Sequence, residues 1–147
     1  MTTAVVGTAL SSLAVRSKPL IGITMGDPCG IGAEVIVKAL ADPEVRSLAR
    51  FIIYGAADVL ETAADAAAIR PFRFRLAHGE ALRVDSGVVV VDFDEYPAGL
   101  WVNARPTAEG GRASLRFVEE ARRQFHEITV AVELQDAVGD GGLSVES

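Results

Sequence analysis

Residues 22–34 read GITMGDPCGIGAE and follow the apolar lead-in KPLI. The run LIGIT at residues 20–24 is typical of a strand buried on both faces. In AEVIVKALAD, at residues 33–42, Val35, Ile36, Ala39 and Leu40 recur at the spacing of a helix. We therefore predict that the loop Gly26–Glu34 joins a first strand to a first helix, with Gly32 at or beside the helix N-cap.

The loop does not match the known phosphate-binding motifs. A Walker loop requires a Lys-Ser or Lys-Thr pair after its second glycine, and that position is acidic or apolar in this sequence. A dinucleotide fingerprint requires a third glycine, but Gly30-Ile31-Gly32 is followed by Ala33 and Glu34. The carboxylates of Asp27 and Glu34 would also repel a phosphate at this helix start. A generic phosphate cradle is therefore the weaker interpretation.

Two interpretations of the loop remain besides a ligand site. A catalytic thiol at Cys29 would require a neighbouring base, and His78 and His126 are both distant in sequence. A plain turn explains the glycines well, because Gly26 and Gly30 give the backbone freedom to reverse. It does not explain why so many special residues follow the carboxyl end of a strand, which is where open α/β sheets bind ligands.

Further along the chain, strand and helix patterns alternate. Strands are predicted around Phe51–Tyr54, in the alternating segment FRFRLAH at 72–78 and in the apolar run that opens GVVVVDFDEY at 87–96. Helices are predicted from Asp58 and from a start between Glu109 and Arg112. This alternation predicts an α/β fold with an open, mainly parallel sheet and flanking helices.

The two ends of the sequence are expected to lie outside this fold. Residues 1–17 resemble a loose leader, because their charges follow the apolar part and so do not form a secretory signal. Residues 18–125 form the α/β part. Residues 126–147 are expected to be a divergent, disordered tail that contains one β-like run, Ile128–Leu134.

Composition excludes several classes of function. Fourteen basic and twenty acidic side chains among 147 residues give a formal charge of -6, without a basic cluster for nucleic acid. No segment has the roughly 20 apolar residues needed to cross a bilayer. One cysteine excludes an internal disulfide, and two isolated histidines offer no metal-ligand spacing. A soluble protein of the reducing cytoplasm is expected.

The segment IGITMGDPCGIGAEVIVKAL, at residues 21–40, resembles the N-terminus of 4-hydroxythreonine-4-phosphate dehydrogenases. The matching positions are Gly26, Asp27, Pro28, Gly30, Ile31, Gly32 and Glu34. All of these positions except Ile31 are our candidates for an active-cleft loop. TAEGGRASLRFVEEA, at 107–121, resembles a second family segment that opens a helix. The sequence departs from the family pattern at two of these positions. Ala33 replaces the usual proline, and Cys29 replaces a smaller residue. A shorter form of the first motif occurs in isopropylmalate and isocitrate dehydrogenases.

The resemblance implies the incomplete N-terminal part of an isocitrate/isopropylmalate dehydrogenase-like fold. It implies an enzyme that uses NAD or NADP and a divalent metal ion to oxidise 4-phosphooxy-threonine in pyridoxal phosphate biosynthesis. It also implies a homodimer that binds a small phosphorylated amino acid. The family's substrate-binding residues and its metal-binding histidines lie beyond the matched part, so no metal ligand or catalytic residue is assigned and the chain is expected to be inactive alone.

Two alternatives remain open. The first is a fragment of a paralogous dehydrogenase that acts on a sugar-acid phosphate, such as a four-carbon one, or on a dihydrodiol. The second is a non-catalytic α/β module in which the glycine-rich loop is only the start of a helix.

Overall fold

The computed structural model describes residues 18–70, 74–80, 87–95 and 105–139, with side chains described as far as Glu127. Eight elements follow one another along these residues: β1 (Leu20–Thr24), α1 (Gly32–Ala41), α2 (Pro43–Leu48), β2 (Arg50–Gly55), α3 (Ala57–Ala66), β3 (Phe74–Ala77), β4 (Val88–Asp92) and α4 (Ala108–Gly139). The four strands pair in the order β1-β2-β4-β3, and every pairing is parallel. The predicted α/β class with a parallel sheet is confirmed.

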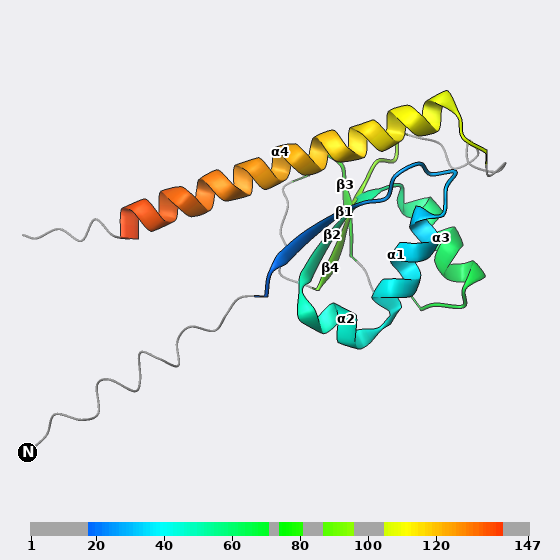
Figure 1. The fold of residues 1–147 in the computed structure, drawn as a ribbon, viewed down its shortest axis with the longest axis horizontal. Helices are drawn as coiled ribbons and strands as arrows, with labels where there is room; N and C mark the ends of the chain where they lie inside the picture. The colour runs from blue at the N-terminus through cyan, green and yellow to red at the C-terminus, as the bar shows by residue number, and fades with distance from the viewer. Residues whose placement is uncertain (1–17, 71–73, 81–86, 96–104, 140–147) are drawn as a thin grey trace, which may run out of the picture.

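Helices cover both faces of the sheet (Figure 1). The helices α1 and α3 pack against each other on one face, and α4 crosses β1 and β2 on the other. The central strands β2 and β4 are buried almost throughout, as expected for apolar runs in the middle of a parallel sheet. The core lies between the sheet and these helices, and it includes Leu40, Ile53, Leu60, Val90 and Phe117.

The helix α4 is fixed to the sheet by aromatic and polar contacts. Phe125 lies against Gly22 of β1, so closely that a Cβ at Gly22 would come within 2.6 Å of the phenyl ring. The buried hydroxyl of Tyr54 donates a hydrogen bond of 2.8 Å to Oε1 of Gln124. Burial of this hydroxyl and the nearby charge of Glu120 raise the pKa of Tyr54, so it remains a donor at physiological pH. These contacts hold the middle of α4 against β1 and β2.

Two local predictions are corrected. Asp42 and Pro43 end α1 as predicted, but they also begin α2: Oδ1 of Asp42 accepts the Glu44 N–H at 2.8 Å, and Pro43 occupies the first turn. The β-like run at Ile128–Leu134 is wrong, since α4 continues to Gly139. The expected disordered tail is therefore helical over 126–139, because β propensity is a weak preference that the continuing helix overrides.

The remaining end segments stay predictions. The leader at 1–17 and residues 140–147 lie outside the described residues, and the boundaries of the 18–125 part are untested. Among the helices that the structure describes, none combines the length and the apolar character needed to cross a membrane.

Candidate functional site

The loop between β1 and α1, residues 25–31, lies at the carboxyl end of the sheet. Its first residue continues the ladder, because the Met25 N–H donates to the Tyr54 carbonyl at 2.9 Å. The next residue, Gly26, has φ of +76°, which is unfavourable for a residue with a side chain. Cys29 lies in a turn. The predicted strand-to-helix connection is confirmed.

Asp27 folds the loop on itself. Its Oδ1 accepts the N–H of Cys29 at 2.8 Å, which forms an Asx turn, and its carbonyl accepts the N–H of Gly30 at 2.8 Å. Pro28 is buried and Gly30 is exposed. Two of the candidate residues, Asp27 and Gly30, thus hold the loop conformation through backbone hydrogen bonds.

Gly32 is the first residue of α1, next to the N-cap Ile31, as predicted. The chain turns so sharply that Gly32 lies against the backbone of Met25. A Cβ at this position would overlap the Met25 carbonyl oxygen and come within 3.1 Å of the carbonyl carbon. The lack of a side chain, and not an unusual φ, is what this position requires.

The structure brings together the two sequence segments that carry the family resemblance. The Asp27 carboxylate lies directly against Gly110 in the first turn of α4: a Cβ there would come within 3.0 Å of Asp27 Cγ and 3.2 Å of Oδ2. The side chain of Thr107 accepts the Gly110 N–H at 2.9 Å and so caps α4. A carboxylate beside a helix N-terminus is electrostatically favourable. Asp27 therefore joins the loop to α4.

A Gly110→Ala substitution is expected to lower the free energy of unfolding by about 1–3 kcal/mol, the usual cost of overpacking a close contact. Urea unfolding would measure this effect at fixed protein concentration. Gly111→Ala is the matched control, since a Cβ at Gly111 has nothing within 4 Å. In an Asp27→Ala background the cost of Gly110→Ala should shrink. An unchanged cost in that background would show that Asp27 is not the obstacle.

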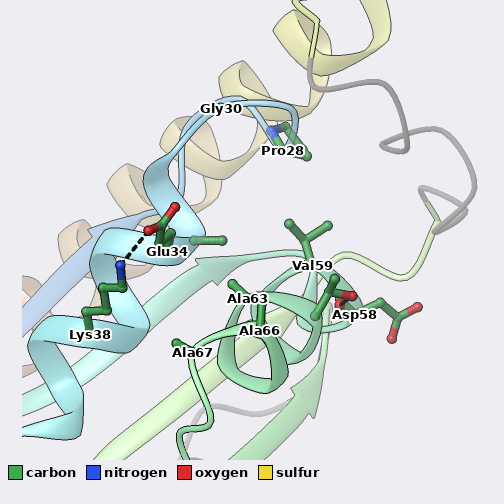
Figure 2. Close-up of a pocket in the computed structure, with 11 residues that line it drawn as sticks. Pro28, Gly30, Glu34, Lys38, Asp58, Val59, Ala63, Ala66 and Ala67 are labelled. Carbon is green, nitrogen blue, oxygen red and sulfur yellow. Dashed lines mark hydrogen bonds and ion pairs between the residues drawn. The ribbon is translucent and has the colours of Figure 1, made fainter.

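A cavity of about 620 Å³ opens below the loop, between α1 and α3 (Figure 2). In Figure 2, Val59, Ala63 and Ala66 of α3 and the C-cap residue Ala67 line one side, and Pro28 lies above them. The lining residues are Pro28, Gly30, Ala33, Glu34, Lys38, Asp58, Val59, Thr62, Ala63, Ala66 and Ala67. The cavity is thus mainly apolar, with charged side chains at its edge.

The charges at this edge do not favour an anion. Glu34 is exposed and accepts a hydrogen bond of 2.5 Å from Nζ of Lys38, and this bond lowers the pKa of the Glu34 carboxyl. The single lysine of the lining is therefore already paired, while Asp58 adds a second carboxylate. This arrangement of charges agrees with the sequence analysis, in which a generic phosphate cradle is the weaker interpretation of the loop.

A second polar group lies at the carboxyl end of β4, where the sequence predicts that the valine strand ends in acidic residues near a cleft, although the partners of these residues could not be predicted. The carboxylate of Asp92 is buried: Oδ1 accepts the Ala57 N–H of α3 at 2.7 Å, and Oδ2 accepts from Nε of Arg75 at 2.7 Å. Hydrogen bonding to Asp92 raises the pKa of Arg75. Since both carboxylate oxygens of Asp92 have a partner, this residue joins α3, β3 and β4. An acidic residue directly after a valine run was its sequence signal.

Metal-binding side chains do not gather in the part of the chain that the structure describes. His78 shares a 3.0 Å hydrogen bond with Glu95 and stacks on Phe93, and Arg116 of α4 reaches Glu95 at 3.3 Å. No group of three or more His, Cys, Asp and Glu side chains there could hold an ion. The described residues therefore do not form the site for a divalent metal.

Comparison with known proteins gives a consistent result, although no protein-family model matches the chain. The chain is 39% identical over 105 residues to a D-threonate 4-phosphate dehydrogenase of Cupriavidus necator, which covers 70% of the chain and 31% of the relative. It is 33% identical over 110 residues to a 4-hydroxythreonine-4-phosphate dehydrogenase of Desulforapulum autotrophicum, covering 69% of the chain and 30% of the relative.

A solved structure shares the fold. The crystal structure of a 4-hydroxythreonine-4-phosphate dehydrogenase from Burkholderia phymatum superimposes with a TM-score of 0.62 at 32% sequence identity, over 72% of this chain and 32% of that one. The chain therefore spans about a third of the length of these relatives. The similarity in sequence and the similarity in fold agree.

Proposed function

By sequence and fold the chain belongs to the 4-hydroxythreonine-4-phosphate dehydrogenase family, of whose members it spans about a third, and we propose that it supplies one wall of the active cleft of such a dehydrogenase. The wall consists of residues 26–34, which include most of the β1–α1 loop and the first residues of α1, and of the first turn of α4. The observation that carries this proposal is the contact of Asp27 with Gly110 at the carboxyl end of the sheet, where open α/β sheets bind ligands.

The reaction of the complete protein is the oxidation of a secondary alcohol of a small phosphorylated substrate. As the family resemblance implies, NAD or NADP would supply the hydride acceptor, and a divalent ion would supply positive charge beside the reacting oxygen. The described residues do not fit either group: they lack a metal cluster, and the loop lacks the third glycine of a dinucleotide fingerprint. The role of this chain's residues is to shape and order the cleft. The complete protein is proposed to be a cytoplasmic homodimer.

Two substrates are candidates. 4-Phosphooxy-threonine, on the route to pyridoxal phosphate, follows from the Desulforapulum and Burkholderia names. D-threonate 4-phosphate, a four-carbon sugar-acid phosphate, follows from the name of the Cupriavidus protein. Both carry a phosphate, whereas the one lysine that lines the described cavity pairs with Glu34 and Asp58 adds a further carboxylate. We infer that the phosphate is bound by the rest of the complete protein.

The purified 147-residue chain is expected to show no dehydrogenase turnover with NAD or NADP, metal and either substrate. Loss of one electrostatic contact to the transition state typically costs on the order of a hundredfold in rate, and this chain lacks several. A chimera, in which residues 18–123 replace the matching part of the Cupriavidus enzyme, is expected to oxidise D-threonate 4-phosphate. A folded but inactive chimera, or turnover by the isolated chain, would contradict the proposal.

A further inference from the structure

The cavity between α1 and α3 has the size and the walls of a small-molecule site. Its volume of about 620 Å³ lies within the range of about 300–1,000 Å³ that is usual for ligand pockets. Its apolar lining consists mostly of small side chains, which leave room between the two helices. The apolar lining residues are Pro28, Ala33, Val59, Ala63, Ala66 and Ala67. The apolar body of a ligand would therefore be shielded from water by both helices.

The charged groups on the two sides of the cavity differ. On the α1 side, Nζ of Lys38 donates to Oε1 of Glu34 at 2.5 Å, so these two charges compensate each other. Figure 2 shows Asp58 on the opposite side, at the start of α3. Nη2 of Arg75 lies 3.9 Å from Oδ1 of Asp58, which is too long for a hydrogen bond. Among the described residues, the Asp58 carboxylate therefore accepts no hydrogen bond from a cation.

The charge of Arg75 is already committed to a buried partner. Nε of Arg75 donates to Oδ2 of Asp92 at 2.7 Å, and Nη2 lies 2.5 Å from the same oxygen. Because the Asp92 carboxylate is buried, it requires this guanidinium as its counter-charge. The acidic residues of α3 are Asp58, Glu61 and Asp65, and the helix contains no basic residue. The α3 side of the cavity therefore has an excess of negative charge.

We propose that this cavity binds a small organic cation, whose apolar body lies between α1 and α3 and whose ammonium group pairs with the Asp58 carboxylate. The hydroxyl of Thr62 does not compete for this carboxylate, because it donates to the backbone carbonyl of Asp58 at 2.8 Å. The apolar body contacts Val59 and the alanines of the lining. This inference does not rest on the proposed dehydrogenase function, since Asp58 and the α3 side of the cavity lie outside the proposed cleft wall.

Other classes of ligand fit the cavity less well. An anion would meet the excess of carboxylates without a free cation among the described lining residues. A metal ion would leave the apolar lining unused, and the described residues contain no group of three or more side chains that could hold one. A neutral apolar molecule would fill the cavity but would leave Asp58 without a donor. An ammonium group on an apolar body satisfies both the lining and the carboxylate.

A titration of the nitrogen-labelled 147-residue chain, followed by NMR spectroscopy, tests the proposal with phenethylamine as the probe. Neutral phenethyl alcohol and anionic phenylacetate are the matched probes, because their apolar parts are closely similar. The amine is expected to shift the amide signals of Thr62, Ala63 and Ala66 until they saturate. It should bind at least about tenfold more tightly than phenylacetate, because only the amine gains a hydrogen bond between charged groups.

Two pairs of substitutions locate the site. Asp58→Asn removes the charge and should weaken binding of the amine about three- to tenfold, as expected for a carboxylate partly exposed to water. Asp65→Asn is its control, because Asp65 lies on the same helix but does not line the cavity. Ala66→Leu fills part of the cavity and should weaken binding of the amine and the alcohol alike. Its control is Ala39→Leu, since Ala39 is an exposed residue of α1 outside the lining.

The three probes keep the test decisive even if a substituted chain does not fold. An unsubstituted chain that binds the amine no more tightly than the alcohol, or that binds neither, would overturn the proposal. A folded Asp58→Asn chain with unchanged affinity for the amine would also overturn it. The amine should bind equally to the Cupriavidus chimera, and loss of binding there would show that the rest of the complete protein covers the cavity, which contradicts the proposal.

Discussion

Substitution of Gly32 by alanine is expected to lower the free energy of unfolding by about 3 kcal/mol, at the upper end of the usual cost of overpacking. The new Cβ would overlap the Met25 carbonyl oxygen, and the obstacle is backbone, which cannot rotate away as a side chain can. To relieve the overlap, either the first turn of α1 or the end of β1 must shift. Both are anchored, because Met25 is hydrogen-bonded to Tyr54 and Ile36 and Val37 of α1 are buried.

Urea unfolding at a fixed protein concentration would measure this loss as a lower midpoint with an unchanged slope. Gly87→Ala is the control, since a Cβ at Gly87 meets nothing within 4 Å. The two substitutions add the same methyl group to glycine positions outside the left-handed region. Equal midpoints for both variants would show that the turn at Gly32 is not sterically closed.

Much of the fold could be predicted from local patterns. LIGIT and the valine run are short and apolar, which is enough to predict parallel strands. The predicted burial is confirmed for β4 but wrong for β1, which lies at the edge of the described sheet and has only exposed or half-buried residues. The helical face of α1 was less well placed: Val35 is 54% exposed, whereas Ile36, Val37 and Leu40 are buried. The spacing of apolar residues in the sequence leaves two neighbouring faces of α1 possible as the buried face. Packing of α1 against α3 selects one of these faces.

The contacts that assemble the site could not be predicted. The sequence shows glycines near the start of α4, but only the fold shows that Gly110 makes room for Asp27 of a distant segment. The partners of Asp92 come from other elements and leave no periodic signal. The helix over 126–139 was missed because its β-branched residues favour a strand locally, while continuation of an existing helix costs little.

If the β1–α1 loop, held by Asp27, borders the active cleft, loss of the Asp27 carboxylate should slow the reaction. In the Cupriavidus chimera, Asp27→Ala is expected to lower kcat/KM on the order of a hundredfold, because small displacements of a cleft wall can have this effect. The substitution removes the Asx turn at Cys29 and the carboxylate beside Gly110. Asp42→Ala is the matched control, since Oδ1 of Asp42 also accepts an N–H two residues ahead, likewise at 2.8 Å, but at the start of α2.

The decisive quantity is therefore the ratio of kcat/KM between the Asp27→Ala and Asp42→Ala chimeras, assayed with D-threonate 4-phosphate well below the melting temperature of both. The Asp27 variant should be slower on the order of a hundredfold, while the Asp42 variant retains the activity of the unsubstituted chimera. Equal activity of the two folded variants would contradict the assignment of this loop to the active cleft.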